Sequence, residues 1–257
     1  MAKAFLIDMD GVLVRGSTAI EGAEGFIGRL NKEAVPYLIF TNNSRLTPEM
    51  QSKRLTDLSL NVAPTHIFSS ALATARFLER QRPGGSAFVV GGPGLEQALD
   101  DVSYRRDDRA PDFVVLGEPV TFDFAAITKA LQLIDRGARF ISTNPDTADP
   151  GEQGIEPACG AIAAMISAAT GVQPYSIGKP NPIMMRFALD RLEVRAGDAL
   201  IVGDRMDTDI IAGMESGLKT VLVLSGVTKE KHIGHFSYRP DHVFPSVAEV
   251  ARDDRFW

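Results

Sequence analysis

The chain has 257 residues, enough for one large α/β domain or for two modest domains with separate cores. Hydrophobic residues make up 44% of the sequence and charged residues 23%, proportions typical of a soluble globular protein. The formal net charge of −6, with no basic run to offset it, argues against a general nucleic-acid binder.

Short apolar segments alternate with amphipathic helical segments in the first part of the chain. The expected strands are 4–7 and 37–40, the segment 65–68 leads into a helix, and the expected helices are 22–33, 47–58 and 71–80. Thr47 suits an N-cap and Pro48 suits a first helical position. Strands that alternate with helices predict a parallel, right-handed, doubly wound sheet.

Polar, Pro/Gly-rich breaks at 81–86 and 170–174 enclose a second set of elements. In this set we expect strands at 87–90, 112–116 and 139–142, helices at 95–99, 122–134 and 160–169, and a polar loop at 143–156. From Tyr175 the earlier pattern resumes, with helices at 183–189 and 210–216, strands at 199–202 and 220–224, and closing elements at 242–244 and 247–250. The sequence therefore predicts a discontinuous core, 1–80 and 175–257, with an inserted α/β domain at 81–174.

Cys159 is the single cysteine, so an intrachain disulfide is excluded and a reducing compartment is indicated. We expect Cys159 to pack at the start of a helix rather than to act as a nucleophile. No signal-peptide pattern opens the chain, and no apolar run reaches about 18 residues. These features predict a cytoplasmic protein without a membrane partner.

Two aspartates end the first apolar strand, in the order Asp8-Met9-Asp10-Gly11. In an extended chain, side chains two residues apart point the same way, so Asp8 and Asp10 are expected to face one small volume. Gly11 allows a sharp turn, and two close carboxylates repel each other unless a cation or a proton intervenes. The alternative is a strand end followed by an Asp-rich turn.

Polar side chains also end other expected strands and loops. They are Thr41 and Asn42, Lys179, and Asp204 with Asp209. The carboxyl ends of parallel strands converge on one crevice, so these groups are expected to meet Asp8 and Asp10. Carboxylates with a water-rich shell suit Mg²⁺, whereas no His or Cys cluster offers a zinc site, since His232 and His235 lie in a polar stretch expected to be solvated.

This set of groups favours phosphoryl transfer. An anion fits between Mg²⁺ and Lys179, which stands at the mouth of a helix, with Thr41 and Asn42 as neutral donors opposite. One aspartate attacks phosphorus and water then cleaves the aspartyl-phosphate. Asp10 is placed to protonate the leaving oxygen and later to deprotonate the water.

The same segments resemble the four ordered motifs of the haloacid dehalogenase (HAD) superfamily of phosphatases. The motifs are Asp8-Met-Asp10-Gly11-Val, Thr41-Asn42, Gly178-Lys179-Pro180 and Gly203-Asp204-Arg-Met-Asp207-Thr208-Asp209. The insertion marks a type C2 cap, and three further segments resemble the NagD-like or para-nitrophenylphosphatase branch: 143–147, 157–160 and 224–227. The resemblance covers essentially the whole chain.

The resemblance implies roles for the acidic residues. Asp8 is the expected nucleophile and Mg²⁺ ligand, and Asp10 the expected acid/base that also offers its backbone carbonyl to the metal. Asp204 is expected to ligate the metal directly, and Asp209 through water rather than directly. Asp207 has no clear place, and helix capping is its expected role.

The resemblance also implies a set of substrate-binding residues: Thr41, Asn42, Asn43, Asn144, Asp146 and Lys179. Thr41 and Asn42 are expected to hold the phosphoryl group, while Lys179 neutralises it and orients Asp8. Asn144 and Asp146 are expected to face the leaving group from the cap, or else to form an ordinary loop turn. Gly91, Gly92 and Gly94 are expected to be tight-turn glycines rather than a dinucleotide-binding loop.

The sequence thus predicts a Mg²⁺-dependent hydrolase of small phosphorylated metabolites, either nucleoside monophosphates (a nucleotidase) or sugar phosphates. A phosphotransferase or mutase of the same superfamily is the main alternative, because it shares the first half-reaction. A non-enzymatic signalling receiver with a phosphoacceptor aspartate is the second alternative, although receivers are about half as long and have no cap. A homodimer formed through the cap is a further expectation.

Overall fold

The computed structural model describes residues 4–151 and 154–257 of the chain. These residues form two compact units. Of the described residues, the first comprises 4–41, Pro48–Phe68 and Lys179–Trp257, and the second comprises Asn42–Thr47, 69–151 and 154–178. Among the described residues, no helix combines the length and the apolar content that a membrane span requires.

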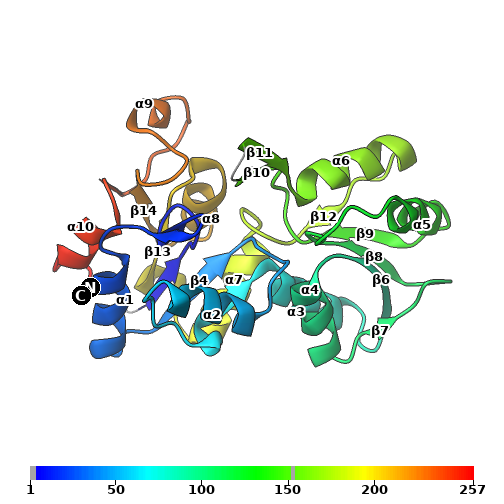
Figure 1. Ribbon diagram of the computed structural model, residues 1–257, viewed down its shortest axis with the longest axis horizontal. Helices are drawn as coiled ribbons and strands as arrows, with labels where there is room; N and C mark the ends of the chain where they lie inside the picture. Colours follow the sequence, from blue (N-terminus) through cyan, green and yellow to red (C-terminus); the bar gives the residue numbers. More distant parts are fainter. Residues whose placement is uncertain (1–3, 152–153) are drawn as a thin grey trace. The chain divides into compact units, whose positions relative to one another are not determined.

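A six-stranded sheet forms the centre of the first unit (Figure 1). Its strands are β1 (Ala4–Ile7), β4 (Tyr37–Thr41), β5 (Ile67–Ser69), β13 (Ala199–Gly203), β14 (Lys219–Val223) and β15 (His242–Phe244). The helices of this unit are α1 (Ala23–Lys32), α2 (Pro48–Asp57), α7 (Pro182–Leu192), α8 (Ile211–Glu215), α9 (Glu230–Ile233) and α10 (Val247–Arg252). Three short helical turns complete it, η1 (Pro64–His66), η2 (Ala196–Asp198) and the π-helical η3 (Met206–Ile210).

The strand order is β15-β14-β13-β1-β4-β5. β1 pairs in parallel with β13 on one side and with β4 on the other. From β1 the chain passes outward through β4 and β5, and it later returns to the opposite side of β1 through β13, β14 and β15. The centre of the sheet is therefore a topological switch point, and the crevice at the carboxyl ends of its strands is where such folds bind ligands.

Continuous apolar runs account for the central strands, because a sheet covered on both faces buries both sets of side chains. All four residues of β1 are fully buried. Phe5 on β1 packs against Phe26 of α1, with ring centroids 5.8 Å apart, and against Trp257, at 5.4 Å. The end of β1 is thereby fixed in a rigid core.

The second unit contains a five-stranded sheet of its own, ordered β12-β9-β8-β6-β7. Its elements are α3 (Ser70–Gln81), β6 (Ser86–Val90), α4 (Pro93–Asp101), β7 (Arg105–Arg106), β8 (Phe113–Leu116), α5 (Phe124–Asp135), β9 (Arg139–Ser142), β10 (Ala148–Gly151), β11 (Gly154–Pro157), α6 (Cys159–Thr170) and β12 (Tyr175–Ser176). The pairs β6–β7, β6–β8, β8–β9 and β9–β12 are all parallel. The predicted doubly wound parallel core with an inserted α/β domain is confirmed.

The boundaries between the two units differ from the predicted ones. β12 pairs with β9, so Tyr175 belongs to the second sheet and not to the resumed core pattern. The helix α3 also groups with the second unit, as does the segment Asn42–Thr47. Sequence alternation marks where strands and helices occur, but it does not show which sheet an edge strand joins.

Two antiparallel ribbons were not expected. β10 and β11 form one of them inside the stretch expected to be a polar loop, of which residues 152–153 lie outside the described part. β2 (Val14–Arg15) and β3 (Thr18–Ala19) form the other, directly after the first acidic motif. Such short, polar strands carry almost no periodic signal.

Candidate active site

Asp8 stands where β1 ends. Its backbone N–H donates to the carbonyl of Val202 on β13, with a nitrogen–oxygen distance of 2.9 Å, so the central strand pair still fixes its position. The chain then turns at Gly11, whose φ of 87° lies in the left-handed region that favours glycine. The Asp8 carboxylate thus lies at the carboxyl end of a rigid strand, where its Oδ1 contacts Lys179 Nζ.

Lys179 connects three parts of the first unit through its ammonium group. Nζ lies 2.6 Å from Asp8 Oδ1, 2.7 Å from Asp209 Oδ1 and 2.9 Å from the carbonyl oxygen of Phe40 on β4. The residue is only 2% exposed. Burial by itself lowers the pKa of Lys179, but the carboxylates of Asp209 and Asp8 raise it well above its ordinary value.

Asp204 follows β13 and is buried. Its Oδ2 accepts a hydrogen bond from the Val227 backbone N–H at 2.6 Å. A Cβ atom added at Gly226 or at Gly11 would collide with the Asp204 carboxylate, so both glycines allow the backbone to approach it closely. Asp204 Oδ1 is buried and has no hydrogen-bond partner among the described residues. A buried acceptor without a partner costs folding free energy unless a bound ligand contacts it.

Asp209 lies in the π-helical turn η3, and both of its carboxylate oxygens are engaged. Oδ1 accepts from Lys179 and Oδ2 accepts from the Arg205 backbone N–H at 3.1 Å. Asp209 is completely buried. Asp209 therefore holds the Lys179 ammonium in place, and whether it reaches a cation through water stays a prediction.

Ligand oxygens of Asp8, Asp204 and Asp209 all lie within 4.8 Å of one another. Three carboxylates against one ammonium leave two negative charges, which one divalent cation balances. Burial raises the pKa of Asp8 well above its usual range, and burial together with the Asp209 carboxylate raises the pKa of Asp204 to about 7. The all-oxygen ligands and the unpartnered Asp204 Oδ1 fit a hard cation such as Mg²⁺.

Asp10 does not join this cluster, which corrects the expectation that Asp8 and Asp10 face one volume. Its Oδ1 lies 3.2 Å from the Arg54 guanidinium, and its side chain is 48% exposed. Arg54 also donates to the carbonyl of Gly16 at 2.8 Å. The strand ends at Ile7 and the chain turns within the motif, so the rule for alternating side chains no longer applies at Asp10.

The predicted phosphoryl-binding residues lie at the end of β4 and in the segment that follows it. Thr41 is buried and is the last residue of β4. Asn42 is half-buried, and its Nδ2 donates to Asp146 Oδ2 at 2.7 Å. Asn43 Oδ1 accepts from the backbone N–H groups of Arg45 and Leu46, both at 3.2 Å, so this side chain shapes the turn.

The two predicted leaving-group residues have different surroundings. Asn144 has no exposed surface, and its Nδ2 donates to the Asn42 carbonyl and to Glu118 Oε1, both at 2.8 Å. Its Oδ1 accepts from the Asp146 backbone N–H at 3.1 Å. In this conformation the Asn144 side chain is therefore committed to the protein interior, whereas Asp146 is half-buried.

The residues without an assigned role are also accounted for. Asp207 pairs with the Arg205 guanidinium at 2.9 Å and does not cap a helix, because the residue preceding η3 is Arg205.

Cys159 is buried at the start of α6, and burial raises the pKa of its thiol to about 12, so packing is its role. Gly92 and Gly94 pass so close to the backbone of Arg45 and Leu46 that a side chain would not fit there. Glycine is needed at these positions for this close approach and not for a tight turn.

Sequence reasoning missed Arg54 and Glu118. Arg54 lies on α2 and pairs with Asp10 across 44 positions of sequence, a contact that no local pattern indicates. Glu118 follows β8 after a single glycine. A polar residue shortly after a predicted strand is the pattern that identified Thr41 and Asp204, and the same pattern indicates Glu118.

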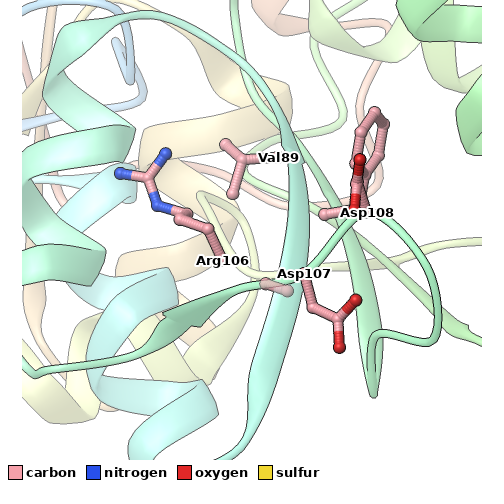
Figure 2. A pocket seen from close by; sticks show the side chains of 6 residues that line it. Val89, Arg106, Asp107 and Asp108 are labelled. Atoms are coloured by element: carbon pink, nitrogen blue, oxygen red, sulfur yellow. The ribbon is translucent and has the colours of Figure 1, made fainter.

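The second unit contains a hollow that is a second candidate site. It has a volume of about 270 Å³ and is lined by Ala87, Phe88, Val89, Arg106, Asp107 and Asp108. Figure 2 shows the Arg106 guanidinium and the Asp107 carboxylate pointing in different directions. Asp107 Oδ1 accepts from the backbone N–H groups of Arg109 and Ala110, and Arg106 pairs with Asp100. The Arg106 and Asp107 side chains do not converge, so the hollow lacks the usual pattern of a ligand site.

Comparison with known proteins identifies the family. The chain is 48% identical over 255 residues to a dihydroxyacetone phosphatase from Corynebacterium glutamicum, covering 98% of this chain and 93% of that protein. Residues 5–105 match the family model described as haloacid dehalogenase-like hydrolase, and residues 176–250 match one described as HAD-hydrolase-like. The chain belongs to the haloacid dehalogenase-like hydrolases.

Further similar proteins cover nearly the whole chain. An acid sugar phosphatase from Staphylococcus aureus is 40% identical over 251 residues, which cover 96% of each protein. The structure of NagD from E. coli K-12 superposes with a TM-score of 0.91 at 38% identity, covering 96% of this chain and 98% of that one. The predicted NagD-like HAD phosphatase is confirmed, and the enzyme is a phosphoric monoester hydrolase.

Proposed function

We propose that this HAD-like phosphatase is a Mg²⁺-dependent hydrolase of small sugar phosphates, and that it works through an aspartyl-phosphate on Asp8. The observation that carries the proposal is the buried cluster of Asp8, Asp204 and Asp209 around Lys179. Names of two relatives, dihydroxyacetone phosphatase and acid sugar phosphatase, support a triose or sugar phosphate over a nucleoside monophosphate.

In the first half-reaction, a carboxylate oxygen of Asp8 forms a bond to phosphorus while the bond to the leaving alcohol breaks. Asp10 gives its proton to the leaving oxygen, for which its side chain must leave Arg54. Lys179 holds Asp8 in place and balances the charge of the phosphoryl group. In the second half-reaction, water attacks phosphorus, Asp10 takes the water proton, and the bond to Asp8 breaks.

The carboxylates of Asp8 and Asp204, with the backbone carbonyl of Asp10, would hold Mg²⁺, and Asp209 would bind through water. The metal supplies the positive charge that lets an anionic nucleophile approach an anionic ester. Thr41 and Asn42 would donate hydrogen bonds to the transferring phosphoryl group. A cytoplasmic location and a homodimer formed through the cap stay predictions.

The test is a phosphate-release assay with dihydroxyacetone phosphate, hexose phosphates, nucleoside monophosphates and an aryl phosphate, in Mg²⁺ and in EDTA. Asp8→Asn is expected to lower kcat by at least about 10⁴-fold, because the nucleophile is lost. Asp207→Asn is the matched control, since its partly exposed pair with Arg205 is worth less than about 1 kcal/mol, and its activity should stay near wild type.

Three results would contradict the proposal. Substantial turnover by Asp8→Asn excludes Asp8 as the nucleophile, and undiminished turnover in EDTA excludes the metal. Transfer of phosphate to an added sugar phosphate faster than to water would make the protein a phosphotransferase or mutase. A clear preference for nucleoside monophosphates would overturn the substrate class alone.

A further inference from the structure

The segment Asn42–Thr47, which follows Thr41, is held by side chains of the second unit. Ser44 is fully buried within it. Ser44 Oγ accepts from the Glu118 backbone N–H at 2.9 Å and from Thr143 Oγ1 at 3.0 Å. In return, the Ser44 backbone N–H donates to Glu118 Oε2 at 3.3 Å. Ser44 and Glu118 therefore form a reciprocal pair between residues 74 positions apart.

The other oxygen of Glu118 reaches the same segment through Asn144. Asn144 Nδ2 donates to Glu118 Oε1 and to the backbone carbonyl of Asn42, each at 2.8 Å. Asp146 links Asn144 back to Asn42. Its backbone N–H donates to Asn144 Oδ1, and its Oδ2 accepts from Asn42 Nδ2. Glu118 thus acts on the segment at two points, directly at Ser44 and through Asn144 at Asn42.

The chemistry of this position calls for an ionised carboxylate. Both oxygens of Glu118 face N–H donors, so an amide or a protonated acid would turn a hydrogen towards one of them. Burial raises the pKa of Glu118 to about 7 and the Asp149 carboxylate adds to this, while hydrogen bonds from Asn144 and Ser44 and the charge of Arg45 lower it. A carboxylate that is 5% exposed is costly to bury, and the interior tolerates it only with these donors.

We propose that Glu118 is a positioning residue for phosphate recognition, because it fixes the backbone of Asn42–Ser44 and with it the donors that follow Thr41. This inference rests on the proposed function, in which Thr41 and Asn42 hold the transferring phosphoryl group. Glu118 is not expected to contact the substrate or the metal. It acts through Ser44 and Asn144.

The first part of the experiment does not depend on activity. Glu118→Gln keeps the size of the side chain but replaces one acceptor oxygen with an amide that faces a donor. Hydrogen exchange of the peptide covering 42–47 is expected to quicken about 10-fold in this variant, while exchange in β13 stays at the wild-type rate. Unchanged exchange in 42–47 would overturn the anchoring role.

The second part measures phosphate recognition in the same variant. The inhibition constant for inorganic phosphate should rise, and kcat/KM for the best sugar phosphate should fall, both by about 10- to 100-fold. Mg²⁺ affinity by calorimetry should stay unchanged, because its expected ligands belong to the first unit. Quicker exchange with unaltered phosphate binding and turnover would overturn the inference and leave Glu118 a structural residue only.

Asp112→Asn is the matched control within the same unit. Asp112 also accepts from a backbone N–H, that of Ser86, and it pairs with Arg82 at 2.7 Å, but among the described residues none of its hydrogen bonds or ion pairs reaches segment 42–47. Its phosphate inhibition constant and turnover should match wild type. A wild-type enzyme that hydrolyses no phosphomonoester would refute the proposed function instead, and the exchange result would still decide whether Glu118 anchors the segment.

Discussion

Lys179 Nζ lies within hydrogen-bonding distance of two buried carboxylates and one carbonyl oxygen, and it is the only ammonium in that cluster of described residues. Asp8 and Asp209 are held near each other against their mutual repulsion by this one cation. A buried ion pair contributes little net stability, but removing one partner leaves an uncompensated buried charge. Removal of the Lys179 ammonium is therefore expected to destabilise the fold.

Lys179→Met is expected to lower the free energy of unfolding by about 3 kcal/mol in Mg²⁺-free buffer at pH 8, measured by urea denaturation. Lys53→Met removes an exposed lysine that pairs with Asp57 on the surface of α2, and this control should cost less than about 0.5 kcal/mol. Equal losses in the two variants would show that the buried pair has no special role.

The side chains of Asp10 and Asn144 have partners that the neighbouring sequence does not indicate. Asp10 was expected beside Asp8, and its partner is Arg54 of α2. Asn144 was expected either to face the leaving group or to form a loop turn; its Nδ2 is buried against Glu118 and Asn42, and its Oδ1 accepts from the nearby Asp146 backbone N–H. In both cases at least one partner comes from another element, so the direction of the side chain depends on packing and not only on its neighbours in sequence.

At the scale of elements, the turn after β14 positions Asp204, the proposed metal ligand. The Val227 N–H holds Asp204 Oδ2, and Ser225 Oγ donates to the Gly11 carbonyl at 2.7 Å, so this turn and the turn after β1 are joined. Gly226 makes the approach possible because a side chain there would occupy the place of the Asp204 carboxylate.

Gly226→Ala is therefore expected to displace Asp204 and to raise the Kd for Mg²⁺ by about 10- to 100-fold, measured by calorimetry. Gly234→Ala is the control, because a Cβ atom at Gly234 meets nothing within 4 Å. Mg²⁺ affinity that is unchanged in Gly226→Ala would mean that Asp204 does not need this turn.

At the scale of the whole molecule, the acidic cluster links stability to pH and to metal. The folded-state pKa of Asp204, about 7, lies above its ordinary value of 3.8, and that of Asp8 is raised in the same direction. The folded protein therefore binds these protons more tightly than the unfolded chain. The stability that results from the raised pKa values of Asp204 and Asp8 is present at low pH and is lost as the pH rises through about 7.

The Tm in EDTA is accordingly expected to be lower at pH 8 than at pH 6. Saturating Mg²⁺ should raise it by about 5 °C at pH 8 and by less at pH 6, where protons compete for the carboxylates. Differential scanning calorimetry measures both effects. Asp204→Asn should reduce the Mg²⁺ effect, and a larger Mg²⁺ effect at pH 6 would contradict the assignment of the metal site.

The sequence by itself determined the alternation of strands and helices, the family, and the four polar motifs with Asp8, Thr41, Lys179 and Asp204. These follow from short-range patterns, because apolar periodicity and residue order are local properties of the chain. Only the tertiary structure decided that Asp209 meets Lys179, that Asp10 pairs with Arg54, and that Glu118 anchors the segment after Thr41. Lys179 and Asp8 are 171 positions apart, and contacts over such distances depend on how the elements pack.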